Sequence, residues 1–334
     1  MISFSPYKFI FMLSLLSGTF LAISSASWFS AWIGLELNLM SFIPLISSKE
    51  NQLPSEASLK YFLIQALGSA IIILSSTLTF FIPSISLCFI SLALLLKLGA
   101  APFHFWFPQV MEGLNWTQII ILMTIQKLAP MFLISYLSSE YFTHIILFLG
   151  GLASAIVGAL GGINQTSLRK ILAYSSINHM SWMLFAMLMN ESSWLIYFFM
   201  YALISTSVAL FFSSTQTYFF SHLINSNSSP VSKIISMMNL YSLGGLPPFS
   251  GFIPKWIIIQ EMILSTFYIP LLILLMSSLV TLYFYIRLTL STLSISCTQM
   301  KWNISLTRIK IFYSPLCSFV NLFGLFIPSM LLVI

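Results

Sequence analysis

The sequence has 334 residues, of which 58% are hydrophobic and only 6% are charged. Soluble domains carry about 25% charged residues, so this chain cannot cover a surface that faces water. The 13 basic side chains outnumber the 7 acidic ones, which are all glutamates. This composition excludes a soluble enzyme, a nucleic-acid-binding protein that works through a basic face, and a disordered chain. It indicates a protein embedded in a lipid bilayer.

Eleven segments are long and apolar enough to be membrane-spanning helices, because a span needs roughly 20 mainly apolar residues. Their apolar runs are continuous, whereas the strands of a membrane β-barrel alternate polar and apolar residues. The connections are mostly short, and no stretch resembles an extramembrane domain. The sequence therefore predicts an all-α polytopic membrane protein. The predicted spans are 5–24, 27–46, 57–82, 85–107, 117–137, 141–162, 168–189, 193–218, 236–262, 267–289 and 311–333.

The charges at the ends of the spans and in the adjacent connections predict a topology. If the N-terminus and the connections after even-numbered spans share one side, that side receives the Lys and Arg of these ends and connections. The other side receives Glu140, His144 and Glu191. Basic residues stay in the compartment of synthesis, so we expect the N-terminus inside and the C-terminus outside. The basic residues of the inner side are Lys8, Lys49, Arg169, Lys170, Lys233, Arg287, Lys301, Arg308 and Lys310.

Two motifs rich in Gly and Pro occur at matching places in the two halves of the chain. The fourth span contains KLGAAPFHFWFP, residues 97–108, and the ninth contains SLGGLPPFSGFIPKW, residues 242–256. Interrupted spans five helices apart, and so in opposite orientation, are typical of inverted-repeat transporters. The alternative is that Gly and Pro are simply common in membrane helices. The residues expected at the helix breaks are Gly99, Pro102, Gly244, Gly245, Pro247 and Pro248.

The inverted-repeat interpretation divides the chain into three parts. Residues 1–138 form a first unit of five helices, with the fourth helix broken. Residues 139–290 form a second, inverted unit of five helices, in which the ninth helix of the chain is broken. Residues 291–334 add a loop on the inner side and the C-terminal span.

Four ionisable residues lie near the middle of predicted spans, namely Glu36, Lys97, Lys127 and Lys255. Each costs roughly 2.5–3.5 kcal/mol at the centre of a bilayer, so their presence indicates a role. A Glu36–Lys97 pair between the second and fourth spans lowers the cost of both residues. Such a pair is either a static lock between two helices or the start of a proton relay that Lys127 and Lys255 continue. Lysine suits a relay because it can release its proton on burial, whereas arginine stays charged.

Three further polar residues are secondary candidates for the relay. Lys60 lies about one turn inside the third span, where it either snorkels to the membrane interface or lines a polar path. His104 follows the first expected break, and His179 lies in the seventh span. Each histidine either relays protons or packs through an ordinary hydrogen bond.

Motifs for catalysis or cofactor binding are absent from the sequence. It has no nucleotide-binding Gly-rich loop, no HExxH, no Cys cluster and no paired His at haem spacing. Cys88, Cys297 and Cys317 are scattered and lack metal-ligand spacing. We therefore predict no catalytic residue, metal ligand or cofactor in this chain. If it belongs to a redox enzyme, the redox centres lie in other subunits.

Six motifs, in chain order, carry a resemblance to a known family. They are WIGLELNLMSFIPL, EASLKYFL, LKLGAAPFHFWFP, QKLAP, NQTSLRKILAYSSINHM and LGGLPPFSGFIPKW. Together they resemble the subunit 2 family of mitochondrial NADH:ubiquinone oxidoreductase (respiratory complex I), in a form close to that of insects. The resemblance covers residues 27–262, and the last two spans fit by placement. This family is in turn similar to Mrp-type cation/proton antiporters.

The resemblance implies a function and a role for each midspan residue. Members of the family are proton-translocating subunits in the mitochondrial inner membrane, where other complex I subunits and lipids surround them. By resemblance, Glu36 is the carboxylate paired with Lys97 of the first broken helix. Lys127 is then the central relay lysine, and Lys255 leads from the second broken helix to the outer half-channel. NADH, FMN, iron–sulfur clusters and ubiquinone are expected in other subunits. The N-terminus is expected in the matrix and the C-terminus in the intermembrane space.

Two other functions are compatible with parts of this pattern. A stand-alone cation/proton antiporter could use the same Glu–Lys chemistry, but the sequence has no Asp and no acidic cluster that would bind Na⁺ through oxygen ligands. A purely structural membrane scaffold would not need four charges in the middle of its spans. The leading interpretation is therefore a proton-translocating subunit of complex I that carries no redox centre.

Overall fold

A computed structural model describes residues 6–47, 51–225 and 230–294. Within these ranges the regular structure is helical, and the extended pairing that occurs there is one isolated bridge between Ser167 and Phe219. The chain forms two compact units, Met1–Ser154 and Ala155–Ile334. This division by compactness falls inside a helix, α8. The repeat boundary expected between residues 138 and 139 precedes that helix and stays a prediction.

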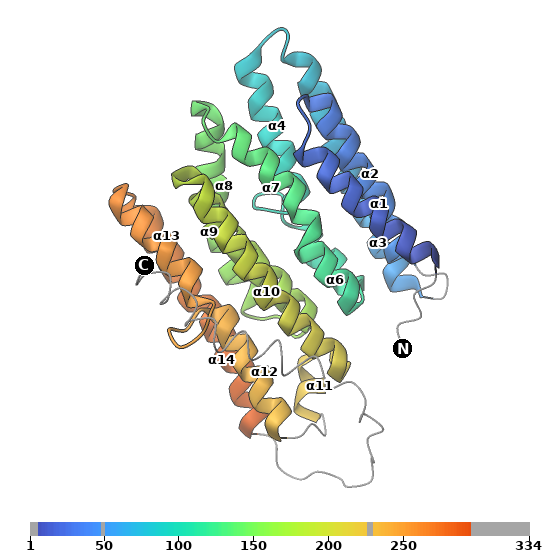
Figure 1. Ribbon diagram of the computed structural model, residues 1–334. Helices are drawn as coiled ribbons and strands as arrows, with labels where there is room; N and C mark the ends of the chain where they lie inside the picture. The colour runs from blue at the N-terminus through green and yellow to red at the C-terminus, as the bar shows by residue number, and fades with distance from the viewer. Residues whose placement is uncertain (1–5, 48–50, 226–229, 295–334) are drawn as a thin grey trace, which may run out of the picture. The chain divides into compact units, whose positions relative to one another are not determined.

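The first unit begins with three long helices, which are α1 (Pro6–Ile23), α2 (Trp28–Ile46) and α3 (Gln52–Leu78). Ser27 caps α2 through a reciprocal pair of hydrogen bonds with Ser30, which fixes where this helix begins. Helices α1 and α2 pack closely because Gly18 and Gly34 face each other; a Cβ at Gly34 would lie 2.5 Å from the backbone nitrogen of Ala22. Figure 1 shows α1, α2 and α3 side by side.

The rest of the first unit consists of shorter helices. They are α4 (Pro83–Leu98), α5 (Trp106–Gly113), α6 (Trp116–Met123) and α7 (Ile125–Leu137), followed by the start of α8 (Tyr141–Gly162). The fourth predicted span is thus divided into α4 and α5. The fifth predicted span, 117–137, is also divided, at Thr124, and the sequence did not predict this interruption. The Ile120 carbonyl accepts two bonds from the residue at the interruption, one from the Thr124 backbone N–H at 3.0 Å and one from the Thr124 hydroxyl at 2.7 Å.

The second unit continues from α8 with α9 (Leu168–Met189), α10 (Glu191–Thr215), α11 (Phe220–Asn225) and α12 (Pro230–Gly244). It ends, within the described residues, with α13 (Phe252–Leu264) and α14 (Tyr268–Ser294). The ninth predicted span, 236–262, is divided into α12 and α13. The 219–235 connection, expected to be a loop, contains α11 and the start of α12.

Six described helical segments are long and apolar enough to cross a membrane, if α6 and α7 are taken together as one segment: Trp28–Ile46, Gln52–Leu78, Trp116–Leu137, Tyr141–Gly162, Glu191–Thr215 and Tyr268–Ser291. Tyr7–Ile23 and Pro83–Leu98 are apolar but shorter. Helix α9 is absent from both sets because Ser, Asn and His lower its hydropathy, although most of its residues are buried. The eleventh predicted span, 311–333, lies outside the described residues, as does the 290–310 connection beyond Ser294.

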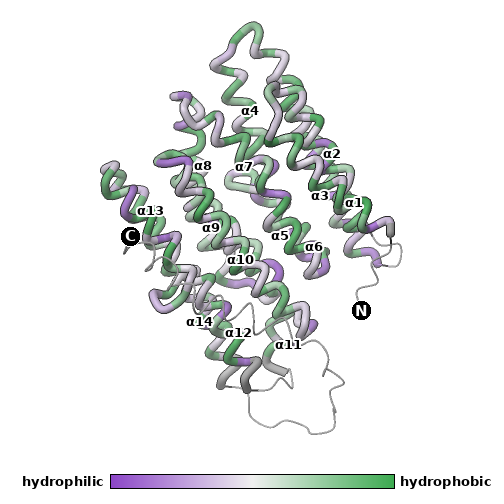
Figure 2. Tube along the Cα trace, viewed as in Figure 1, coloured by the Kyte–Doolittle hydropathy of each residue, from purple (hydrophilic) through white to green (hydrophobic). Residues whose placement is uncertain are grey.

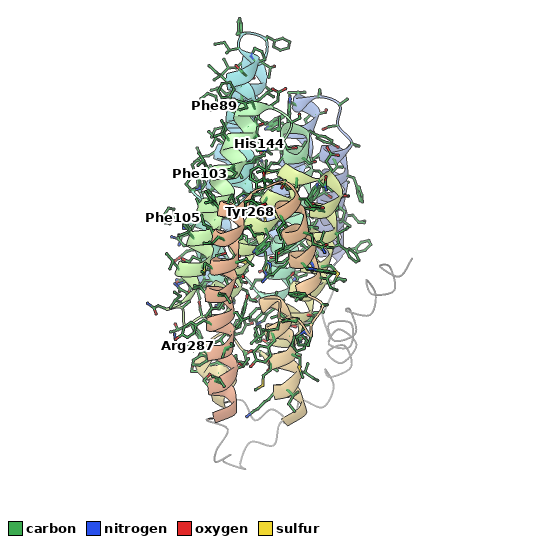
Figure 3. All side chains as sticks on the ribbon, turned by 90° about the vertical axis from the view of Figure 1, so that its left-hand side faces the viewer. Phe89, Phe103, Phe105, His144, Tyr268 and Arg287 are labelled. Carbon is green, nitrogen blue, oxygen red and sulfur yellow. The ribbon has the colours of Figure 1, made fainter. Side chains whose placement is uncertain are left out.

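The surface of the helices is apolar. Figure 2 shows hydrophobic residues along most of the helices, with hydrophilic residues at scattered positions. Many large apolar side chains are exposed, among them Phe89, Phe103 and Phe105, which Figure 3 labels. Soluble monomers rarely expose large contiguous apolar areas. These side chains therefore suit a surrounding of lipid or of neighbouring membrane proteins.

Candidate functional site

The first broken helix ends in a turn that is held by side chains of other segments. Gly99 follows α4 with a φ of 70°, a left-handed conformation that favours glycine. The Trp106 indole donates to the Leu96 carbonyl at 3.0 Å, and the Gln65 amide donates to the Lys97 carbonyl at 3.2 Å. Two carbonyls at the end of α4 are thus satisfied without using the Lys97 ammonium. This arrangement meets the requirement that backbone polar groups at membrane depth find partners within the protein.

Glu36 and Lys97 lie within electrostatic range of each other in the first unit. Lys97 is 6% exposed, and its stem lies against Gly68 of α3, where a Cβ would come within 3.1 Å of Lys97 Cγ. Among the described residues no direct ion pair joins Glu36 to Lys97, and the Glu36 Oε2 atom is buried without a hydrogen bond. The two residues therefore interact across a gap rather than as a closed salt bridge.

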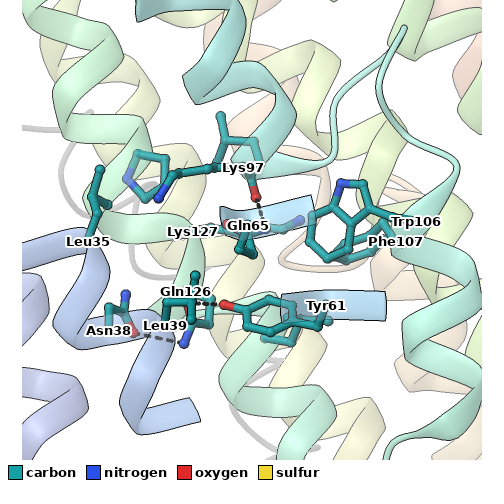
Figure 4. A pocket seen from close by; sticks show the side chains of 13 residues that line it. Leu35, Asn38, Leu39, Tyr61, Gln65, Lys97, Trp106, Phe107, Gln126 and Lys127 are labelled. Atoms are coloured by element: carbon teal, nitrogen blue, oxygen red, sulfur yellow. Dashed lines mark hydrogen bonds between the residues drawn. The ribbon is translucent and has the colours of Figure 1, made fainter. Parts of the chain in front are cut away.

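A small cavity in the first unit brings Lys97 and Lys127 to one place. Its volume is about 20 Å³, enough for about one water molecule. Lys127 is 2% exposed, and its ammonium lies 5.1 Å from the centre of the Phe107 ring. Figure 4 shows both lysines among the lining side chains. The lining residues are Leu35, Asn38, Leu39, Tyr61, Gln65, Lys97, Leu98, Trp106, Phe107, Leu122, Gln126, Lys127 and Pro130.

Three of the lining residues form a hydrogen-bonded chain. The Tyr61 hydroxyl donates to Gln126 Oε1 at 3.1 Å, and Gln126 Nε2 donates to Asn38 Oδ1 at 2.8 Å. Dashed lines in Figure 4 mark these bonds. Asn38, Tyr61, Gln65 and Gln126 were not among the residues predicted from the sequence. The available signal was their position, because Asn38 and Gln126 stand within two residues of Glu36 and Lys127 in the sequence.

The second broken helix uses its lysine differently. Gly245 follows α12 with a φ of 74°, and Lys255 Nζ donates to the Gly244 carbonyl at 2.8 Å. A Cβ at Gly245 would lie 2.9 Å from Lys255 Nζ, so the absent side chain leaves room for the ammonium. Lys255 is 7% exposed, and its Nζ lies 6.0 Å from the centre of the Trp182 ring. Here the lysine ammonium itself donates to a carbonyl at the end of the helix.

His179 belongs to a buried group of aromatic hydroxyls in the second unit. Its Nδ1 lies 2.8 Å from the Tyr197 hydroxyl, and its ring centre lies 5.1 Å from that of Tyr201. His179 precedes Trp182 by one turn of α9, and Trp182 contacts Lys255. His179 was a candidate from the sequence, but the tyrosines were not, because a tyrosine in a membrane helix is hard to distinguish by sequence from an ordinary apolar residue.

The other secondary candidates lie in the first unit. His104 is 8% exposed, and its Nδ1 lies 3.2 Å from the Pro102 carbonyl within the break. Lys60 is exposed on α3 and does not line the cavity. Among the described residues, no group of three or more His, Cys, Asp or Glu side chains could hold a metal ion.

Comparisons with known proteins give consistent relatives. The family described as NADH:quinone oxidoreductase/Mrp antiporter, TM, matches residues 25–281. A protein of Anopheles gambiae named NADH-ubiquinone oxidoreductase chain 2 is 44% identical over 97% of this chain and 98% of its own length. A protein of Locusta migratoria with the same name is 36% identical over 96% of each chain.

Solved structures share the fold at lower identity. A chain of respiratory complex I from Thermus thermophilus has a TM-score of 0.83 and 24% identity, covering 98% of this chain and 81% of that one. A chain of the Mrp complex from a Dietzia species has a TM-score of 0.73 and 16% identity, covering 85% of this chain and 59% of that one. At these identities the likeness shows an antiporter-like fold.

Proposed function

The chain belongs to the NADH:quinone oxidoreductase/Mrp antiporter family of membrane proteins, and from that premise we propose its function. It is a membrane-arm subunit of respiratory complex I that translocates protons across the inner mitochondrial membrane. Electron transfer from NADH to ubiquinone, which drives this translocation, takes place in other subunits. Support comes from relatives named NADH-ubiquinone oxidoreductase chain 2, which align with nearly the whole chain at up to 44% identity.

The proposed proton path begins in the first unit. Glu36 is the carboxylate that acts on Lys97, Lys97 is the lysine of the first broken helix, and Lys127 is the next carrier. The observation that carries this proposal is the water-sized cavity lined by both lysines within an otherwise apolar bundle. Buried charges in a membrane protein are the usual sign of an ion or proton path.

The later carriers in this proposal belong to the second unit. Lys255, at the second broken helix, takes the place that Lys97 has at the first, and His179 is a secondary carrier through its contact with Tyr197. His104 is a secondary carrier next to the first break. Lys60 is left as a lysine that reaches the membrane interface, because it is exposed and lies outside the cavity lining.

We further propose the inverted repeat of two five-helix units, with eleven spans in all. The two matching motifs support this repeat. In each motif a glycine in the left-handed conformation, Gly99 or Gly245, directly follows a helix that ends inside a predicted span. The proposed topology puts the N-terminus in the matrix and the C-terminus in the intermembrane space, as the distribution of basic residues favours. Other complex I subunits and lipids surround the chain, and NADH, FMN, iron–sulfur clusters and ubiquinone bind to those other subunits.

A stand-alone antiporter is the second candidate, because the chain shares its fold with a chain of the Mrp complex. Mild solubilisation separates the two functions, because a complex I subunit must migrate with many other subunits. In a native gel, we expect the chain to comigrate with NADH oxidation activity. By mass photometry, we expect it in a large particle of many subunits. A small particle without that activity would instead identify an antiporter.

The proposed topology predicts which segments a membrane-impermeant reagent reaches. Cysteines introduced in the 219–235 connection should react from the matrix side, and a cysteine beside Glu191 should react from the intermembrane side. The measurement is labelling in sealed mitoplasts and in inverted vesicles. Labelling of the 219–235 connection only from the intermembrane side would overturn both the topology and the number of spans.

A further inference from the structure

The chain formed by Tyr61, Gln126 and Asn38 has a fixed hydrogen-bond direction. Gln126 uses its oxygen to accept from Tyr61 and its nitrogen to donate to Asn38, so its amide cannot rotate without breaking both bonds. The Tyr61 ring is also held, by an edge contact with Phe42 at 5.2 Å and a contact with Trp106 at 5.9 Å between ring centres. Tyr61 and Asn38 are 2% and 3% exposed. The polar wall of the cavity is therefore held by hydrogen bonds and by ring packing.

The two lysines on this cavity stand at helix ends of opposite sign. Lys97 lies in the last turn of α4, where the partial negative charge of a helix C-terminus attracts a cation. Lys127 lies in the first turn of α7, where the partial positive charge of a helix N-terminus repels a cation. A proton that moves from Lys97 to Lys127 thus moves against these helix-end charges. Such a step needs a bridge of defined geometry, because proton transfer requires hydrogen-bond contact.

We propose that Tyr61, Gln126 and Asn38 are positioning residues that hold one water molecule between Lys97 and Lys127. The Tyr61 hydroxyl, whose proton is committed to Gln126, accepts a hydrogen bond from this water and so orients it. In the step, the Lys97 ammonium gives a proton to the water, and the water gives another proton to the neutral Lys127 amine. One water is present before and after, and one positive charge has moved. The inference rests on the proposed relay. It adds a frame, formed by Tyr61, Gln126 and Asn38, that makes the first proton transfer of the relay possible.

The frame also explains why a neutral wall surrounds two lysines. A carboxylate at the position of Gln126 would pair with a lysine and trap the proton, whereas an amide orients water without holding charge. A cavity of about 20 Å³ admits about one water and excludes a longer chain of waters. Loss of one orienting bond should therefore slow the transfer rather than open another route.

The test is Tyr61→Phe in the assembled complex, reconstituted in liposomes. Coupled NADH:ubiquinone turnover should fall about two- to tenfold, the rate equivalent of one ordinary hydrogen bond. The solvent deuterium isotope effect on turnover should rise, which a merely structural loss would not cause. The matched control is Tyr241→Phe, since the Tyr241 hydroxyl also bonds one side-chain oxygen, Thr289 Oγ1 at 2.8 Å, away from the cavity. This control should leave both quantities unchanged.

Lys127→Met separates the inference from the proposed function. If Lys127→Met impairs coupled turnover and Tyr61→Phe behaves as wild type, the frame is overturned and the relay stands. If Lys127→Met has no effect, the relay falls and the frame with it. An experimental structure of the whole complex that resolves water gives a test without any variant. A water within hydrogen-bond distance of the Tyr61 hydroxyl, between the two lysines, supports the frame, and a dry cavity overturns it.

Discussion

Lys97→Met is expected to reduce coupled turnover about tenfold or more while the complex still assembles, and Lys97→Arg is expected to do nearly the same. Methionine cannot carry a proton, and arginine cannot release one. Moving one charge against 100 mV takes about 2.3 kcal/mol. Moving a cation from 4 Å to 8 Å from its partner changes their attraction by roughly 2 kcal/mol at an effective dielectric near 20. Changes in the Glu36–Lys97 interaction are therefore large enough to bias a proton step.

Arginine distinguishes the relay from a static lock between helices. A static lock needs only a positive charge opposite Glu36, so it would tolerate Lys97→Arg much better than Lys97→Met. The measurements are proton uptake into liposomes, coupled turnover and the amount of assembled complex. Lys8→Met, which removes an exposed lysine of α1, is the matched control for loss of charge. Normal pumping by the Arg variant, together with failed assembly of the Met variant, would replace the relay by the lock.

The sequence predicted several helices closely because local patterns determine them. The observed bounds of α8 and α9 coincide with the predicted spans 141–162 and 168–189, and α1 and α2 differ from theirs by about one residue at a few ends. Each of these helices is bounded by polar or small residues that end an apolar run. The interruptions after Gly99 and Gly244 also follow from a local signal, since Gly and Pro disrupt helices within a few residues of themselves.

The interruption at Thr124 has no such signal. The nearest Pro is Pro130, which lies six residues further on and inside α7, and the residues before Thr124 are apolar. A threonine hydroxyl that bonds its own helix can bend that helix, but the same residue is common in regular membrane helices. Only the structure shows that Thr124 ends one helix just before Lys127. The consequence for function is that Lys127 stands at a helix N-terminus rather than in mid-helix.

The sequence also could not predict that Lys97 and Lys255 differ in whether they bond the end of their broken helix. Both lysines belong to similar motifs, so the sequence gives them equivalent roles. In the structure Trp106 and Gln65 satisfy carbonyls at the end of α4, whereas Lys255 itself bonds the end of α12. The bonded residues lie between 10 and 32 positions apart in the sequence, from Trp106 to Leu96 up to Gln65 to Lys97. Long-range contacts of this kind depend on how helices pack, which apolar periodicity does not determine.

Gly251→Ala is expected to prevent normal folding of the second break. A Cβ at Gly251 would overlap the backbone carbonyl oxygen of Ser242 and would also approach Ile204 at 3.3 Å. A backbone oxygen cannot rotate away as a side chain can, so the segment between α12 and α13 would have to move. Overpacking typically costs about 1–3 kcal/mol and occasionally more, and a backbone atom that cannot move aside places this clash at the upper end of that range. That movement would also separate Lys255 from the Gly244 carbonyl. We expect a severe loss of assembled complex, measured by quantitative native gels and by the midpoint of thermal inactivation.

Gly244→Ala is the matched control for that substitution, because it adds the same methyl group seven residues earlier. The nearest atom to a Cβ at Gly244 is Tyr285 Cδ2 at 3.5 Å, an ordinary van der Waals contact. Gly244 is the last residue of α12, and alanine favours a helix more than glycine does, by up to about 1 kcal/mol. Alanine also keeps the carbonyl that accepts from Lys255. Gly244→Ala should therefore assemble at least as well as the wild type. Equal assembly of the Gly251→Ala complex would show that the close approach of Gly251 to Ser242 does not determine the shape of the break.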